Sequence, residues 1–553
     1  MNTLQDVHQQ FASLFHNQSI FPYAEALSRQ MADGHVCIDL KQLEDQTQDH
    51  IQHLRAIPNL VSTDESTIRP FVLNGSRLYL HRYFSYESDI IQSIKRFLAI
   101  EKDLMADRRK LLNDNNALLQ SLFPTQPNVT NWQYVAATAA FLHQFSIISG
   151  GPGTGKTTTV SKLLILLYQS NPQLKVALAA PTGKAAMRMA DALKAAIQQV
   201  EVSATVKQLF EHLQPQTIHS LLKFVTNSTQ FKHNQDNPLP FDLVIIDESS
   251  MVDVALMAKL LNAIQPTSRV LLLGDRNQLA SVEAGSIFGD LCQINADAAP
   301  DSPLYQHLTE LKQSHRFDDN KGIGKLSKAI ITGDVTQVLN FYSNSDPAIL
   351  ITDNQDDYHF KQFIEQYKAY IEEPDTLLAL QKFNQIRVLC AVREGDQGVF
   401  HFNQRIENYL QQAGYLNLDN LFYTNRPLMV TQNNPSLGLF NGDIGIIRSD
   451  ADGPKVWFLD SKQALRSVLP GYITKAETVF AMTIHKSQGS EYQQVMVVLP
   501  ESGRSELLTR ELLYTGVTRA KEKVILRASQ EVVTATVSRT VKRVSGLSER
   551  FHR

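Results

Sequence analysis

Cysteine is scarce in this sequence and long apolar runs are missing, and both absences limit the kinds of protein it can be. The three cysteines, Cys37, Cys292 and Cys390, lie far apart with no CxxC pair, which favours neither a disulfide framework nor a zinc site. No apolar stretch reaches the roughly 18 residues that a membrane-spanning helix needs. The first residues, MNTLQDVHQQ, lack the basic and apolar regions of a signal peptide. We therefore expect a cytoplasmic protein.

A strong charge of either sign is missing as well. The 53 Lys and Arg residues nearly balance the 56 Asp and Glu residues, which leaves a net charge of −3. This balance argues against a broad polybasic surface for nucleic acid, although a narrow channel lined by a few cationic and hydroxyl side chains remains compatible with it. The chain is 43% hydrophobic and 20% charged, which is typical of a folded protein. Its length suggests roughly three or four domains.

The most informative segment that is present is a complete phosphate-binding loop. An apolar strand pattern, Phe145–Ser149, precedes it, and a helical run, Thr158–Tyr168, follows it. Its glycines let backbone N–H groups turn toward phosphates, Lys156 can reach the β- and γ-phosphates, and the Thr157 hydroxyl can hold Mg²⁺. The residues predicted to bind a nucleoside triphosphate are Gly150, Gly151, Pro152, Gly153, Thr154, Gly155, Lys156, Thr157 and Thr158.

Two further apolar strands end in polar side chains. Asp242–Ile246 is followed by Asp247, which can hold Mg²⁺, and by Glu248, which can orient or deprotonate an attacking water. The strand over 271–273 leads to Gln278, a candidate sensor of the γ-phosphate. Because ligands bind at the carboxyl ends of strands in open α/β sheets, we expect these side chains to meet at the phosphate loop.

The order of the expected elements predicts an α/β fold with two parallel sheets covered by helices. Short apolar strands alternate with helices, first at 145–149, 175–180, 242–246 and 269–273, then at 387–391, 494–499 and 523–526. Residues 1–110 have apolar positions at helical spacing and no chemical motif, so we predict a helical N-terminal domain. Residues 111–335 and 336–553 then form the two α/β domains, with a small insert at 223–241 and a β-rich insertion at about 415–478.

Further segments, taken with the phosphate loop, occur in the order typical of superfamily-1 helicases, and the sequence resembles that family. They are Asn131–Ala137, Pro181–Ala186, Thr217–Leu222, Asp247–Asp253, Gly274–Val282, Gln313–Phe317, Thr483–Glu491 and Tyr514–Ala520. Within the superfamily, Ala391–Gly395 and Gly438–Gly445 are most similar to the RecD family, the alpha subunits of RecBCD enzymes (exonuclease V).

The resemblance implies two RecA-like P-loop NTPase domains with ATP and Mg²⁺ in the cleft between them. Gln133 would read the adenine, Glu491 would join the nucleotide site from the second domain, and Arg316 and Arg519 would stabilise the γ-phosphoryl charge. An arginine brought across the cleft makes hydrolysis depend on closure. The residues implied to contact DNA are Thr182, Thr217, His219, Thr483 and His485.

The resemblance also implies the biological setting. Family members move 5′ to 3′ on single-stranded DNA and work with RecB-like and RecC-like subunits in double-strand-break repair and recombination. Residues 1–110 would dock those partners, and the β-rich insertion would be an SH3-like accessory domain. The nuclease belongs to the RecB partner, and we find no separate carboxylate cluster here, so we expect no nuclease site in this chain.

Three alternatives remain open. A stand-alone helicase would share the motor, but such relatives carry a longer N-terminal extension that this sequence lacks, so we favour a complex subunit. A scaffold that has lost turnover would lack at least one of the required side chains, and all are present. An RNA-directed helicase would share the ATP motifs, and a contact to the 2′-OH cannot be read from sequence.

Overall fold

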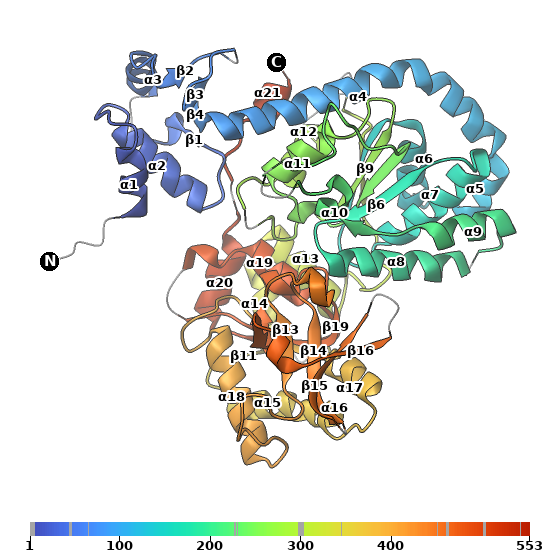
Figure 1. Cartoon of the computed structure of the whole chain (residues 1–553), viewed down its shortest axis with the longest axis vertical. Helices are drawn as coiled ribbons and strands as arrows, with labels where there is room; N and C mark the ends of the chain where they lie inside the picture. Colours follow the sequence, from blue (N-terminus) through green and yellow to red (C-terminus); the bar gives the residue numbers. More distant parts are fainter. Residues whose placement is uncertain are drawn as a thin grey trace.

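The computed structural model describes residues 6–43, 47–64, 66–125, 127–198, 200–225, 228, 230–281, 283–296, 304–343, 346–450, 452–460, 464–501, 505–541 and 543–552. Within these ranges the strands assemble into four sheets (Figure 1). Two are the parallel sheets expected from the sequence, one lies in the N-terminal region, and one forms the insertion in the second half of the chain. No described helix combines the length and the apolar character needed to cross a bilayer.

The N-terminal region contains a small sheet beside its helices, which the prediction of a helical domain did not include. Helices α1 (Val7–Ser13), α2 (Phe21–Ala32) and α3 (Thr47–Arg55) accompany strands β1 (Cys37–Asp39), β2 (Val61–Ser62), β3 (Phe71–Asn74) and β4 (Arg77–Leu80), in the order β1-β4-β3-β2. These strands are two to four residues long, too short for a clear alternating pattern. One signal was available: Gly75, at φ +61°, and Ser76 form the two-residue loop between the paired residues Asn74 of β3 and Arg77 of β4, and a Gly-Ser pair is a hairpin signal.

A long helix connects this region to the first parallel sheet. Helix α4 (His81–Asp114) continues past residue 110 and lies along the top of the first α/β domain in Figure 1. Its buried residues Ile90, Ile94 and Phe97 belong to the same core cluster as Phe145 of that domain. Helix α4 is therefore packed into the first motor core rather than isolated from it.

The first parallel sheet has the order β10-β5-β9-β8-β6-β7. Its strands are β5 (Phe145–Gly150), β6 (Val176–Ala180), β7 (Gln216–Thr217), β8 (Leu243–Ile246), β9 (Arg269–Gly274) and β10 (Leu308–Leu311). Val244 and Ile246 join the core on one face of the sheet, and Leu243 and Ile245 join the core on the other, which confirms burial on both faces. The helices of this domain are α5 (Asn116–Leu122), α6 (Trp132–Leu142), α7 (Lys156–Ser170), α8 (Gly183–Gln198), α9 (Ala204–His212), α10 (Ile218–Leu222), α11 (Val254–Asn262) and α12 (Ile287–Ala296).

The second parallel sheet has the order β11-β20-β19-β12-β18. It contains the predicted strands β12 (Ile386–Cys390), β19 (Tyr492–Val498) and β20 (Ala520–Arg527), together with β11 (Ile349–Thr352) and β18 (Ala481–Thr483), which the sequence pattern did not reveal. Its helices are α13 (Gly322–Thr332), α14 (Val335–Ser343), α15 (Asp357–Ile364), α16 (Lys368–Ile371), α17 (Thr376–Phe383), α18 (Val399–Gln412), α19 (Arg510–Val517) and α20 (Gln530–Ser538). A last helix, α21 (Leu547–Phe551), lies back beside α4 (Figure 1).

The insertion is a five-stranded antiparallel sheet, which confirms its β-rich character. Its order is β16-β15-β14-β13-β17, formed by β13 (Pro427–Val430), β14 (Ile444–Asp450), β15 (Gly453–Leu459), β16 (Leu465–Val468) and β17 (Ala476–Thr478). In the smaller insert an antiparallel bridge pairs Phe224 with Phe231. Parts of both inserts, residues 226, 227, 229, 451 and 461–463, lie outside the described residues.

Candidate active site

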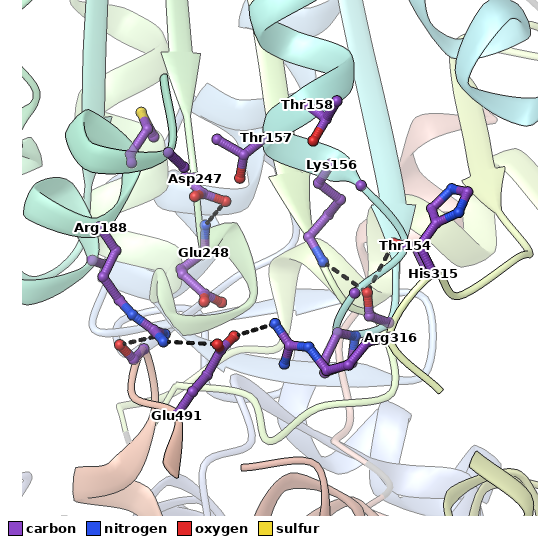
Figure 2. A pocket seen from close by; sticks show the side chains of 18 of the residues that line it. Thr154, Lys156, Thr157, Thr158, Arg188, Asp247, Glu248, His315, Arg316 and Glu491 are labelled. Atoms are coloured by element: carbon purple, nitrogen blue, oxygen red, sulfur yellow. Dashed lines mark hydrogen bonds and ion pairs between the residues drawn. The ribbon is translucent and has the colours of Figure 1, made fainter. Parts of the chain in front are cut away.

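A cavity of about 760 Å³ lies between the two α/β domains and collects nearly all the residues predicted to bind ATP (Figure 2). It is lined by Gln133, Gly151–Thr158, Ala185, Arg188, Met189, Asp191, Ala192, Asp247, Glu248, Gln278, His315, Arg316, Gly489, Glu491 and Arg519. Lys156 and Arg519, from different domains, therefore face one space. Gly150 is not in the lining, but its carbonyl accepts a hydrogen bond from the Lys156 ammonium.

The phosphate loop has the backbone that its glycines predict. β5 ends at Gly150 and α7 begins at Lys156, with Gly153 at φ +77° and Gly155 at φ +85°. A Cβ atom on Gly155 would lie 2.2 Å from the side-chain Nε2 of Gln133, which would have to move, and the φ of +85° itself favours glycine. Lys156 Nζ donates to the carbonyl oxygens of Gly150 (2.5 Å) and Gly151 (3.3 Å), within its own loop.

The acidic residues at the strand ends are buried beside this loop. Burial raises the pKa of Asp247 to about 6, and repulsion from Glu248 adds to that effect, while Lys156 opposes it. Glu248 has φ +51°, a conformation that is strained for a residue with a side chain. Burial also raises the pKa of Asp275, whose Oδ2 accepts hydrogen bonds from Gln278 Nε2 (3.1 Å) and, across the cleft, from the Tyr514 hydroxyl (2.9 Å).

The second domain contributes a carboxylate surrounded by cations. Glu491 lies 2.7 Å from Arg316, 3.1 Å from Arg188 and 3.5 Å from Lys521. Burial by itself would raise the pKa of Glu491, but these cations outweigh it and hold that pKa at about 2. Figure 2 shows Arg188 and Arg316 reaching Glu491 from opposite sides.

Arg519 is 3% exposed and is held by backbone carbonyls. Its Nε donates to Thr515 O (3.0 Å) and one Nη donates to Ser490 O (3.3 Å). Burial lowers the pKa of Arg519, and the nearby Glu248 opposes that shift. The guanidinium is thus fixed in orientation at the wall of the cavity.

Among the cavity residues that were missed from the sequence, Arg188 and His315 contact predicted site residues. Arg188 lies one helical turn after Lys184 on α8. The only hint in the sequence was that this helix begins within the predicted Pro181–Ala186 segment. His315 lies inside the predicted Gln313–Phe317 segment but had no role; its Nε2 is 3.3 Å from Gln133 Nε2. Neither residue type carries a local signature that distinguishes a site from a surface.

The residues predicted to contact DNA lie outside the cavity, at the carboxyl ends of strands near the edge of each parallel sheet. Thr182 follows β6, Thr217 ends β7 and Thr483 ends β18. Each threonine hydroxyl accepts a backbone N–H three residues further on. The His219 ring stacks on the Phe224 ring, with centroids 5.3 Å apart, and His485 follows Thr483 on the second sheet.

One other cluster of possible metal ligands occurs among the described residues, at the opposite edge of the first sheet. Glu101 of α4 lies 2.9 Å from His143 Nδ1 and 3.5 Å from His307 Nε2, and it accepts the Gln144 N–H at 2.6 Å. His307 Nδ1 is 2.6 Å from the carbonyl oxygen of Phe145. Hydrogen bonds account for this cluster. Its members are far apart in sequence, so no pattern pointed to it.

Comparison with known proteins agrees with this architecture. A model described as an AAA domain matches residues 133–284, and one described as a UvrD-like helicase C-terminal domain matches residues 478–527. The RecBCD enzyme subunit RecD of Haemophilus influenzae is 34% identical, over 87% of this chain and 81% of that protein. The same subunit of Mycolicibacterium smegmatis is also 34% identical, over 95% and 92%. An ATP-dependent RecD2 DNA helicase of Deinococcus radiodurans is 28% identical, over 69% of this chain and 46% of that protein.

The two RecBCD subunits match over most of their own length and of this chain. Together with the two domain matches and the cleft between the parallel sheets, they identify the protein as a member of the RecD family of superfamily-1 helicases.

Proposed function

We propose that this protein is an ATP-hydrolysing DNA helicase subunit of a RecBCD-like complex that acts in double-strand-break repair and homologous recombination. The observation that carries the proposal is the single cavity lined by Lys156, Asp247 and Glu248 of the first domain and by Glu491 and Arg519 of the second. A site assembled from two domains makes ATP hydrolysis depend on their approach, which is what a motor requires.

The first domain supplies the triphosphate grip and the groups that act on water. Lys156 leaves the loop carbonyls to bind the β- and γ-phosphates, and the backbone of Gly150–Thr158 surrounds them. Glu248 orients the attacking water and accepts its proton. Gln278 senses the γ-phosphate, and Gln133 reads the adenine.

The arginines stabilise the charge that develops on the transferred phosphoryl group. Arg519 is held in place by the carbonyls of Thr515 and Ser490, so little reorganisation is needed at the reaction. Arg316 is paired with Glu491, and this pair can reorganise when a nucleotide enters. Opening and closing of the cleft then moves the two domains along a strand.

The residues at the cavity fit Mg²⁺. Magnesium prefers oxygen ligands, and the buried Asp247, whose pKa is raised by burial and by Glu248 in spite of Lys156, gains from a divalent ion. Asp247 and the Thr157 hydroxyl, which lie next to one another in the view of Figure 2, would hold it. When bound, the ion neutralises charge on the phosphates.

The DNA track runs over the sheet edges marked by Thr182 and Thr217 in the first domain and by Thr483 and His485 in the second. Hydroxyls and exposed aromatic rings suit a motor that tolerates any sequence. His219 and the stacked Phe224, which is 64% exposed, supply such a platform. Travel is 5′ to 3′, in keeping with the family.

Membership in a complex is supported by the extent of the match. The chain covers 81% and 92% of two RecBCD subunits, against 46% of the RecD2 helicase. The N-terminal region, with Val7, Leu14 and Ile68 each at least 67% exposed, offers apolar surface for RecB-like and RecC-like partners. The small sheet of the insertion acts as an SH3-like accessory domain. Cutting of DNA is left to the partner.

The test is ATP hydrolysis by the full chain with and without single-stranded DNA. We expect DNA to stimulate hydrolysis and Lys156→Ala to abolish it, because the ammonium is the only side-chain cation on the phosphate loop. Lys194→Ala, which changes an exposed lysine of α8, is the matched control. Equal rates for wild type and Lys156→Ala would refute the motor. Stronger stimulation by RNA than by DNA would instead indicate an RNA helicase.

A further inference from the structure

The C-terminal segment, residues 543–552, crosses from the second motor domain back to the first. After α20 the chain leaves the second sheet, and α21 lies beside α4 (Figure 1). Leu547 is fully buried and Phe551 nearly so, and both belong to the core that contains α4, α11 and α12. The segment is therefore an integral part of the first domain, although it follows the second in sequence.

Polar contacts anchor this segment at both of its neighbours. Arg550 pairs with the fully buried Glu87 of α4 at 3.1 Å, and Glu87 also accepts the Gly546 N–H at 3.1 Å. In the N-terminal region, Val36 N donates to Val544 O (3.2 Å), and Val544 N donates to His35 Nδ1 (2.8 Å). These anchors fix the backbone on either side of Val544 and so fix Arg543.

The Arg543 guanidinium binds three backbone carbonyls of one loop. It donates to the carbonyl oxygens of Ser281 (2.6 Å), Glu283 (3.1 Å) and Gly285 (3.1 Å). The same loop is bound to the N-terminal region, because Gly285 N donates to Gly34 O at 2.9 Å. Gly34 has φ +87°, and a Cβ atom there would lie 2.9 Å from the guanidinium, so the side chain is closely enclosed.

The other end of this loop touches the ATP site and the second domain. The chain passes from Asp275 and Gln278 at the cavity to Leu279, whose N–H donates to Thr515 Oγ1 (3.0 Å) and whose carbonyl accepts from Gln488 Nε2 (2.9 Å). Burial lowers the pKa of His485 in the predicted DNA track, and the nearby charge of Arg543 adds to that shift. Arg543 is thus bonded to the loop that follows Gln278 and is close enough to His485 for its charge to act on that ring.

We propose that Arg543 is a positioning residue for DNA-stimulated ATP hydrolysis, which holds the carbonyl groups of Ser281, Glu283 and Gly285 and so keeps Leu279 in contact with Thr515 across the cleft. It is not among the residues that line the cavity and acts through the loop carbonyls. The inference rests on the proposed helicase function, since it assigns a means by which DNA binding at one side reaches the phosphate sensor at the other.

The experiment compares Arg543→Ala and Arg543→Lys with wild type in the full chain. We expect Arg543→Ala to lower kcat of DNA-stimulated hydrolysis about 10-fold or more, since small displacements of catalytic groups have effects of that size. KM for ATP and hydrolysis without DNA stay unchanged. Lysine lacks the planar fork, so Arg543→Lys recovers only part of the rate. Arg539→Ala is the control, because Arg539 donates to Leu508 O within the second domain.

Two further measurements separate positioning from general destabilisation. Hydrogen exchange at the amides of Leu279 and Gly285 becomes faster in Arg543→Ala, while the phosphate loop stays protected. Thr515→Val removes the acceptor on the far side of the loop, and its effect on kcat does not add to that of Arg543→Ala. Normal stimulation and exchange in Arg543→Ala would overturn the inference alone. Wild type without any stimulation by DNA would overturn the helicase function as well.

Discussion

The two polar clusters at opposite edges of the first parallel sheet differ in whether their charges are balanced. At the carboxyl edge, burial and Glu248 raise the pKa of Asp247 to about 6. At the amino edge, burial would raise the pKa of Glu101, but His143, His307 and the Gln144 N–H outweigh it and lower that pKa. A buried cluster that its own side chains do not balance is suited to a charged ligand, whereas a balanced one serves the fold.

The largest expected effect is a loss of catalysis when a carboxylate at the carboxyl edge is replaced. Glu248→Gln keeps the shape of the side chain but removes the proton acceptor, so we expect DNA-stimulated kcat to fall by about 10²-fold or more. Binding of a fluorescent ATP analogue should persist. Glu211→Gln, at an exposed position of α9, is the matched control. If Glu248→Gln hydrolysed ATP at the wild-type rate, another residue would have to accept the proton from the attacking water.

A substitution in the cluster at the amino edge should lower the stability of the fold and leave catalysis unchanged. Glu101→Gln leaves His143 and His307 without their carboxylate, so we expect the free energy of unfolding to fall by about 3–5 kcal/mol in urea denaturation at pH 7. Per folded molecule, kcat stays unchanged. The exposed neighbour Asp103, changed to Asn, provides the control. A loss of activity without a loss of stability would show that this cluster has a functional role.

The pH dependence of that deficit has a definite sign. The pKa of Glu101 is lower in the fold than its ordinary 4.5, so its contribution is fully present above about pH 4.5 and is lost as pH falls through the folded value. The difference between wild type and Glu101→Gln should therefore shrink in acid. A deficit that stays constant from pH 7 to pH 3 would contradict a charge-based role.

The smallest expected effect is a gain in stability, from a substitution at the carboxyl edge. The pKa of Asp247 rises from 3.8 to about 6, so ionisation opposes folding at neutral pH. Asp247→Asn should stabilise the nucleotide-free protein by up to about 3 kcal/mol at pH 7 while it impairs hydrolysis. The gain vanishes below pH 4, where the carboxyl group is protonated in both states. Thermal unfolding of Asp247→Asn measures this gain in stability, and Asp107→Asn, at an exposed position, is the control. If Asp247→Asn were less stable than wild type, the charge of Asp247 would not be unbalanced in the fold.

Much of the first domain was predictable because its signals are contiguous. The phosphate loop between β5 and α7, and Asp247 and Glu248 after β8, follow from residues adjacent in sequence. The positions of Glu491 and Arg519 came through family resemblance instead. Nothing local in their segments shows that Glu491 meets Arg188 or that Arg519 faces Lys156.

Other features could not be found from local patterns. The strands of the N-terminal sheet are too short to show an alternating pattern, and the only local signal was the Gly75-Ser76 turn between β3 and β4. Helix α4 crosses residue 110 because its apolar stripe continues onto the first motor core, which a composition change near 113 concealed. Arg543 is an ordinary basic residue in sequence, and its three carbonyl partners come from a loop that precedes it by 258 to 262 residues.

The sequence by itself determined the local elements of the motor: the glycine backbone of the phosphate loop, the apolar strands, and the carboxylates at their ends. These depend on allowed backbone angles and on side-chain periodicity over a few residues. Only the tertiary structure decided which charges balance one another, as for Glu101 with His143 and His307 or Glu491 with its three cations. Such pairs form between distant residues, because burial removes water and leaves each charge dependent on whichever groups the fold brings beside it.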